Sequence, residues 1–169
     1  VKGEAWLEEV ILPKDFYWEL AGFRRERALK DWENLGLKLR TEKLKIDKNL
    51  YSTLLLPQGK EGPAFLAFKN FEIYLKWNDS FIYTVTAAHL AKRLGGAKKY
   101  KHNNPSDILD IESMIKLQKV LKSRGYDVGK VDGILGAKTR QAVRLVQLEF
   151  GLPADSWPTK DLLSKLSMN

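Results

Sequence analysis

The chain has 169 residues, 44% of them hydrophobic, which is enough for one medium domain or for a domain of about 100 residues and a small module. It has no cysteine, which excludes disulfides, thiolate metal sites and cysteine nucleophiles. The net charge of +8 is spread along the chain, which favours anionic surroundings (cell-wall polymers, lipid headgroups, nucleic acid) but does not mark a nucleic-acid groove, where Lys and Arg concentrate on one face.

The first quarter of the chain predicts short strands around a helix. Residues 5–12 read as a strand, and a short helix is expected over residues 16–21. Residues 24–35 place apolar side chains at helical spacing, and Gly36 ends that helix. Residues 37–46 alternate apolar and polar side chains, which predicts two short, half-buried strands.

The middle of the chain predicts a hairpin followed by two helices. Residues 51–56 and 63–68 are β-rich runs, and the segment between them contains Pro and Gly, so a small antiparallel sheet with a hairpin is expected. Helices are expected over residues 71–77 and 81–94. Their candidate N-caps are Asn70 for the first helix and Asp79 or Ser80 for the second.

The last third of the chain predicts a separate helical unit. Residues 97–108 are charged and rich in turn formers, without periodicity, so we place a linker there. The expected fold class is α+β for residues 1–96, with a small antiparallel sheet and helices, followed by a separate three-helix, all-α unit at residues 109–169. The three helices are expected over residues 110–124, 137–150 and 160–166.

Residues 115–152 carry a dense motif. Its positions are Leu117, Gln118, Leu121, Gly125, Tyr126, Gly129, Asp132, Gly133, Gly136, Thr139, Ala142, Val143, Gln147, Gly151 and Leu152. This pattern closely resembles the three-helix peptidoglycan-binding module found on many cell-wall hydrolases. Glycines 133 and 136 permit tight turns, and Asp132 and Thr139 can bond to loop or helix amides, so a structural role is expected for these four residues. Binding is therefore assigned to the module as a whole.

The first part of the chain carries a second resemblance. The matching positions include Pro57, Gly59, Gly62, Pro63, Asn70, Phe71, Trp77, Asn78, Ser80, Tyr83, Leu90, Arg93 and Gly96. They resemble the end of the catalytic domain of B-type membrane-bound lytic murein transglycosylases, a lysozyme-like family. The stretch around Trp6 resembles the entry to that family's β subdomain. The two resemblances together cover nearly the whole chain, in the order usual for this group.

The resemblance implies a parent enzyme that cleaves the MurNAc–GlcNAc glycan strand of peptidoglycan with a 1,6-anhydro product. In that family one Glu acts as acid and then as base, and the 6-hydroxyl of the substrate closes the ring. This Glu is followed by Ser or Thr, an aromatic residue and Gly, and no glutamate of this chain has those neighbours. We therefore expect the catalytic Glu to lie upstream of Val1, assign no catalytic residue, and expect this chain alone to be inactive. The alternative is a non-catalytic peptidoglycan-binding protein.

Four residues are candidates for one wall of the substrate cleft. The resemblance implies that the Asn78 amide meets N-acetyl groups, while Trp77 and Tyr83 offer flat faces to sugar rings. Trp77 stands where the family usually has Tyr, so a hydroxyl is lost. Trp77 and Tyr83 fit a packed core equally well, and Ser80 fits a helix cap as well as a contact.

In the C-terminal module, Tyr126 and Arg140 are candidates to line a shallow groove beside the loop. His89 and His102 are too far apart to suggest a metal pair, so we expect neither a metal nor a cofactor. The expected partners are peptidoglycan glycan strands and no nucleic acid. We expect a monomer in the periplasm or cell envelope of a bacterium, with membrane attachment only through an N-terminal segment outside this sequence.

Overall fold

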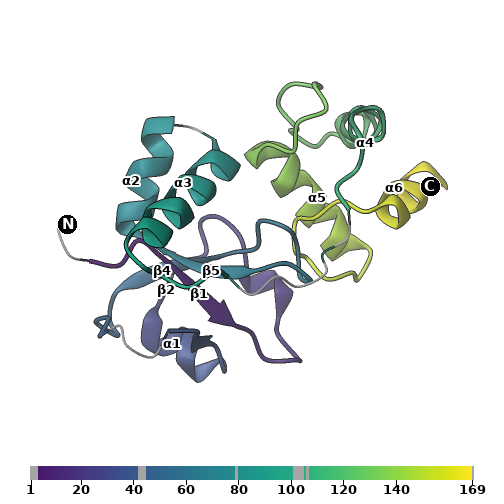
Figure 1. The fold of residues 1–169 in the computed structure, drawn as a ribbon. Coiled ribbons are helices and arrows are strands. Elements are labelled where there is room, and N and C mark those ends of the chain that lie inside the picture. The colour runs from purple at the N-terminus through teal and green to yellow at the C-terminus, as the bar shows by residue number, and fades with distance from the viewer. Residues whose placement is uncertain (1–3, 42–44, 79, 101–104, 106, 169) are drawn as a thin grey trace.

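The fold is α+β, and its centre is an antiparallel sheet (Figure 1). The structure is a computed structural model that describes residues 4–41, 45–78, 80–100, 105 and 107–168. Within these residues the sheet has five strands in the order β2-β4-β5-β1-β3, and every neighbouring pair is antiparallel. The strands are β1 (Leu7–Ile11), β2 (Arg27–Ala28), β3 (Lys38–Leu39), β4 (Tyr51–Leu55) and β5 (Ala64–Phe68).

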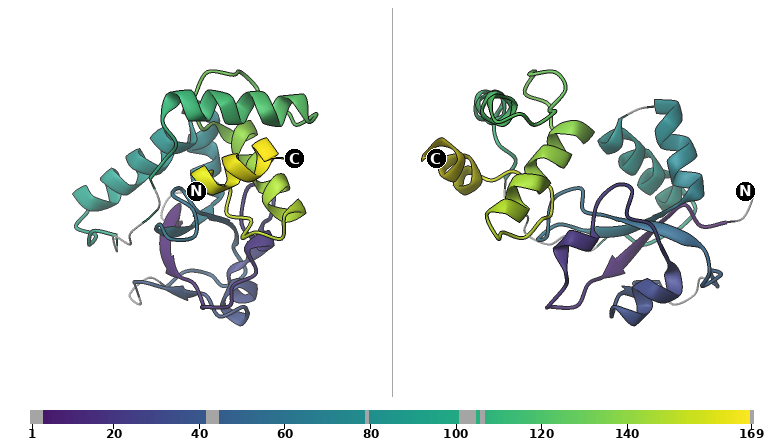
Figure 2. Two further views of the ribbon diagram at one scale, coloured as in Figure 1. Left: turned by 90° about the vertical axis from the view of Figure 1, so that its right-hand side faces the viewer. Right: turned by 180° about the vertical axis from the view of Figure 1, so that it is seen from behind.

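Helices cover both faces of the sheet and continue beyond one end of it. In Figure 1, α2 and α3 lie over one face, α1 lies under the other, and α4, α5 and α6 form a group beside the sheet. The right-hand view of Figure 2 shows that α5 is the member of that group nearest to the sheet. The helices are η1 (Trp18–Leu20, a 3-10 turn), α1 (Leu29–Asn34), α2 (Lys69–Asn78), α3 (Phe81–Leu94), α4 (Ile111–Ser123), α5 (Ala137–Glu149) and α6 (Lys160–Met168).

The β4–β5 hairpin is buried on both faces, because its alternate side chains enter two different cores. Leu54 pairs with Leu66 and faces the core between the sheet and α1. Leu55 pairs with Phe65 and faces the core between the sheet and helices α2 and α3. Successive side chains of a strand point to opposite faces, so an uninterrupted apolar run is what a strand covered on both sides requires. Trp32 of α1 is fully buried, and its indole N–H donates to the Ser52 carbonyl oxygen at 3.0 Å.

The hairpin and the long helices confirm the sequence predictions, but the helix expected over residues 24–35 is shorter. It begins only at Leu29, because Arg27 and Ala28 form strand β2 and pair with β4. Strand pairing therefore overrides the helical spacing in the first part of this segment. Gly36 adopts a φ of +88° directly after the helix, as expected of the residue that ends it.

Of the two helix caps predicted for α2 and α3, only the cap of α3 is found. Asn70 lies inside α2, where its side-chain amide donates to the Glu4 carbonyl oxygen at 3.3 Å, so the prediction that it caps the helix is wrong. Ser80 does cap α3. In the strand expected near residues 44–46, Leu44 lies outside the described residues, and the described part forms no strand.

The three C-terminal helices enclose their own apolar core, in which the polar side chain of Gln118 is fully buried. Gln118 of α4 has no exposed surface, and its amide bonds to the loop that connects α4 to α5. Its Nε2 donates to the Ile134 carbonyl oxygen at 3.0 Å, and its Oε1 accepts from the backbone N–H groups of Asp132 and Gly133 at 3.1 and 2.9 Å. The hydrogen bonds of the buried Gln118 side chain therefore fix the conformation of this loop.

We predict that Gln118→Leu destabilises the chain, because the new side chain fills a similar volume but leaves the loop amides without their acceptor. The free energy of unfolding should fall by about 1–3 kcal/mol. The measurement is urea unfolding. Gln141→Leu is the matched control, because Gln141 is exposed on α5 and its replacement should change stability by less than about 0.5 kcal/mol. Equal effects of the two substitutions would contradict the assigned role.

Candidate functional site

The candidate cleft residues gather at the turn between α2 and α3. Trp77 is 72% exposed and Tyr83 is 53% exposed, so neither belongs to the core of the described chain. Ser80 accepts a hydrogen bond from the Tyr83 backbone N–H at 3.4 Å, which fixes the first turn of α3. The side chain of Asn78 and the whole of Asp79 lie outside the described residues.

Two aromatic residues that the sequence reasoning missed extend this site. Tyr74 stacks on Trp77 with ring centroids 5.6 Å apart and an interplanar angle of 28°, and Trp6 meets Tyr74 edge-on at 6.3 Å. The signal in the sequence is the spacing of three residues between Tyr74 and Trp77, which places them on one side of a helix. The result is a row of three rings running from the segment before β1 to the end of α2.

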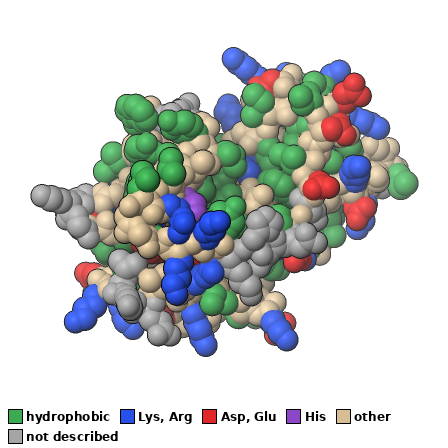
Figure 3. Space-filling view, viewed as in Figure 1, with side chains coloured by type: hydrophobic (Ala, Val, Ile, Leu, Met, Phe, Trp, Pro, Cys, Tyr) green, Lys and Arg blue, Asp and Glu red, His purple; other side chains and the backbone are tan. Residues whose placement is uncertain are grey.

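Hydrophobic side chains gather over α2 and α3 in the space-filling view (Figure 3). Six large apolar residues of these two helices are exposed, in an aromatic and aliphatic surface of the kind that receives the flat face of a sugar ring or another apolar surface. They are Ile73, Trp77, Ile82, Tyr83, Leu90 and Leu94.

The buried carboxylates among the described residues all bond to neighbouring groups. The two buried carboxylates there are Glu8 and Asp155, and both are engaged. Glu8 forms an ion pair with Lys92 at 2.5 Å, and Asp155 accepts from the Trp157 backbone N–H and the Gln147 side chain at 2.9 and 2.7 Å. A catalytic acid must reach its substrate in a partly apolar cleft, whereas both of these carboxylates bond to neighbouring groups of the chain.

The described residues contain no group of His, Asp and Glu side chains that could hold a metal ion. None of the helices in the described ranges is both long enough and apolar enough to cross a membrane.

Tyr126, the first candidate in the C-terminal module, is half-buried against the core of the three helices. Its hydroxyl donates to the Glu149 carboxylate, and this hydrogen bond raises the pKa of Tyr126. The ring therefore lies at the surface with its hydroxyl already oriented by α5. An exposed edge of this kind can contact a ligand without a change of rotamer.

Arg140, the second candidate, is placed differently from the expectation of an exposed groove residue. Its side chain is only 4% exposed, because it projects from α5 and packs against the unit that contains the sheet. The guanidinium lies 4.9 Å from the Phe81 ring and 5.6 Å from the Trp157 ring, and Nη2 donates to the Pro57 carbonyl oxygen at 2.8 Å. Burial lowers the pKa of Arg140 to about 10, and the nearby Asp155 carboxylate opposes that shift.

A second buried arginine and a carboxylate complete this contact between the two parts of the chain. Arg144, one turn further along α5, is 2% exposed and its Nη2 donates to the Glu19 carbonyl oxygen at 2.6 Å. Asp155 accepts from the Lys60 backbone N–H at 2.9 Å. The bonds from Arg140, Arg144 and Asp155 join segments that are 83 to 125 positions apart in the sequence. The orientation of the helical module relative to the sheet therefore depends on them.

Comparisons with known proteins agree with this two-part arrangement. The family model described as Transglycosylase SLT domain matches residues 1–92, and a model for a peptidoglycan binding domain matches residues 111–166. The chain therefore belongs to the SLT transglycosylase family and carries a peptidoglycan-binding domain after the transglycosylase part. The fold and the succession of two units predicted from the sequence resemblance agree with that membership.

The solved relatives match almost the whole chain, whereas the curated relative matches only part of it. Two crystal structures of SltB3 from Pseudomonas aeruginosa, one with NAG-anhNAM-pentapeptide and one with NAG-NAM-pentapeptide, match at 38% identity. They cover 99% and 98% of this chain with TM-scores of 0.81 and 0.79, and the chain spans 46% of theirs. A spore cortex-lytic enzyme of Bacillus cereus is 46% identical over 57 residues, which are 32% of this chain and 22% of that protein.

We predict that Arg140→Ala weakens the contact between the two units, because it leaves the Pro57 carbonyl oxygen without its donor and empties the space beside Phe81 and Trp157. The free energy of unfolding should fall by about 2–4 kcal/mol, with faster amide hydrogen exchange at Lys60.

Arg124→Ala is the matched control for this prediction. The Arg124 guanidinium also donates to a backbone carbonyl oxygen, that of Leu166 at 2.9 Å, but it does so within the helical module and from an exposed position. It should leave the exchange rate at Lys60 unchanged. If Arg140→Ala also leaves that rate unchanged, Arg140 does not hold the two units together.

Proposed function

We propose that this chain is part of a lytic transglycosylase that cleaves the MurNAc–GlcNAc glycan strand of peptidoglycan with a 1,6-anhydro product. The catalytic Glu, in this proposal, lies outside the chain. The main support is the match to SltB3 over 99% of the chain at 38% identity, because it includes both units and their relative placement. One of the two SltB3 structures is a complex with NAG-anhNAM-pentapeptide.

In the proposed function the α2–α3 surface forms one wall of the glycan cleft. The stacked rings of Tyr74 and Trp77 receive the apolar face of a sugar, and the exposed Tyr83 lies on the first turn of the next helix. Asn78, as in the family it resembles, meets N-acetyl groups through its amide. Ser80 acts through the backbone, because its hydroxyl is used as the α3 cap.

The chain is proposed to divide into the end of a transglycosylase catalytic domain at residues 1–96, a linker at 97–108 and a peptidoglycan-binding module at 109–169. The described residues of the linker, 97–100, 105 and 107–108, form no helix or strand. In the module, the loop held by Gln118 and the Tyr126 ring supply the proposed contacts with the glycan. Peptidoglycan is the proposed partner and the bacterial envelope the proposed location of this chain, as a monomer.

A second candidate function is wall binding without cleavage. The observation that favours it is the state of the carboxylates described above, since both buried ones are bonded and no Glu of the sequence has the neighbours of the family's acid. Both candidate functions include binding to peptidoglycan. They differ only in whether residues outside this chain supply the catalytic acid that cleaves the glycan.

We predict that the purified chain sediments with teichoic-acid-free sacculi without releasing soluble anhydro-muropeptides. Retention should persist at about 1 M salt, where the screening length falls to about 3 Å and simple charge attraction fades. Trp77→Ala should weaken retention about three- to tenfold through the loss of an aromatic face. The measurements are a pull-down and chromatography of the supernatant.

Tyr51→Ala is the control for the aromatic substitution, because Tyr51 is 66% exposed on β4, away from the α2–α3 turn. It should bind like the unaltered chain. Recovery of the chain in the supernatant at both salt concentrations, or loss of binding at high salt, contradicts wall recognition. Release of anhydro-muropeptides contradicts the proposal that the acid lies outside the chain.

A further inference from the structure

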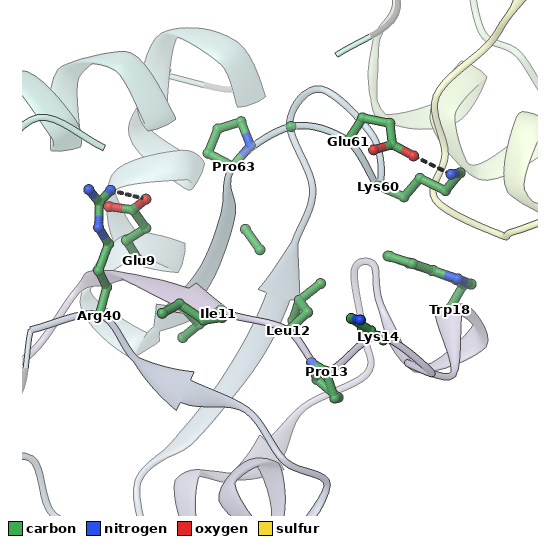
Figure 4. Close-up of a pocket in the computed structure, with 13 residues that line it drawn as sticks. Glu9, Ile11, Leu12, Pro13, Lys14, Trp18, Arg40, Lys60, Glu61 and Pro63 are labelled. Atoms are coloured by element: carbon green, nitrogen blue, oxygen red, sulfur yellow. Dashed lines mark hydrogen bonds and ion pairs between the residues drawn. The ribbon is translucent and has the colours of Figure 1, made fainter. Parts of the chain in front are cut away.

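A cleft of about 390 Å³ opens where β1 ends (Figure 4). One wall comes from β1 and the residues that follow it as far as Trp18, and the other comes from the β4–β5 turn at residues 60–63. Arg40 closes one end. The volume falls within the range of about 300–1,000 Å³ that is usual for small-ligand sites.

Both walls of this cleft are held in place by backbone hydrogen bonds. The Lys60 backbone N–H donates to the Asp155 carboxylate at 2.9 Å, and a Cβ on Gly59 would lie 2.6 Å from the Trp157 Cβ, so the turn fits closely against the helical module. On the other side the Arg40 backbone N–H donates to the Glu9 carbonyl oxygen at 3.0 Å. The cleft is therefore formed before a ligand arrives, which lowers the ordering cost of binding.

The lining combines charges of both signs with an apolar middle. The Arg40 guanidinium and the Glu9 carboxylate lie 2.5 Å apart at one end, and Lys60 pairs with Glu61 at the other (Figure 4). Lys14 adds an exposed ammonium group between Pro13 and Trp18. The residues that line the cleft include no side-chain hydroxyl and no side-chain amide. The apolar part comes from Val10, Ile11, Leu12, Pro13, Trp18, Pro63 and Ala64.

We propose that this cleft binds a short peptide that carries both carboxylate and ammonium groups, such as the stem peptide of peptidoglycan; this rests on the proposed function. Ligand carboxylates pair with Lys14, Arg40 or Lys60, a ligand ammonium group pairs with Glu61, and small alkyl side chains pack on Trp18. A neutral sugar offers no charge to these groups, whereas a peptide with carboxylate and ammonium groups can pair with both signs. The glycans bound by the two SltB3 structures carry a pentapeptide.

The experiment is a titration of the full chain with the free peptide L-alanyl-γ-D-glutamyl-meso-diaminopimelyl-D-alanyl-D-alanine, followed by the amide NMR signals. Saturable shifts are expected at Lys60 and Gly62, with a dissociation constant of about 0.1–10 mM. Lys14→Glu should weaken binding about three- to fivefold, as expected for one exposed charge pair. Lys119→Glu makes the same charge change on the exposed side of α4 and should leave the affinity unchanged.

Three results overturn this proposal. The first is the absence of shifts at Lys60 and Gly62 up to about 10 mM peptide. The second is an equal loss of affinity in Lys14→Glu and Lys119→Glu, which indicates unspecific charge attraction. The third is the same set of shifts with the neutral disaccharide N,N′-diacetylchitobiose, which makes the cleft a sugar site. The free peptide contains no glycan, so these results are separable from retention on sacculi.

Discussion

The arrangement of the two units depends on two arginines of α5 that are buried against the sheet unit. Burying a guanidinium costs free energy unless its donors and its charge are compensated. Arg140 obtains compensation from the Pro57 carbonyl oxygen, the faces of Phe81 and Trp157, and the Asp155 carboxylate, which also opposes the fall of its pKa. Arg144 obtains less, since among the described atoms its Nε and Nη1 have no partner while Nη2 reaches Glu19.

These contacts therefore hold the proposed wall-binding module and the transglycosylase unit in one relative orientation. The turn at Lys60 is fixed by Asp155 on one side and forms a wall of the cleft at the end of β1 on the other. The ring of Phe81, which Arg140 covers, belongs to the first turn of α3, next to the exposed Tyr83. The cleft at the end of β1 and the α2–α3 surface therefore each lie next to a segment that contacts the helical module. The proposed binding surfaces of the module and of the α2–α3 helices are linked by these contacts.

The sequence predicted those features that local patterns encode. The β4–β5 hairpin follows from two apolar runs around a Pro- and Gly-containing turn, and α4 and α5 follow from helical spacing. Arg140 could not be placed in this way, because its partners Pro57 and Phe81 lie far from it in the sequence and no local pattern links a charged residue to them. The short α1 has a similar cause, since pairing of Arg27 with a distant strand decides where the helix begins.

The most direct test of a fixed arrangement is a distance distribution between one spin label on each unit. The chain has no native cysteine, so Lys76→Cys on α2 and Lys119→Cys on α4, both at exposed positions, give two unique labels. Pulsed electron double resonance should show one narrow distance distribution, which broadens when Arg140 and Arg144 are both replaced by Ala. A broad distribution in the otherwise unaltered chain would contradict the view that the buried arginines hold the two units in a single orientation.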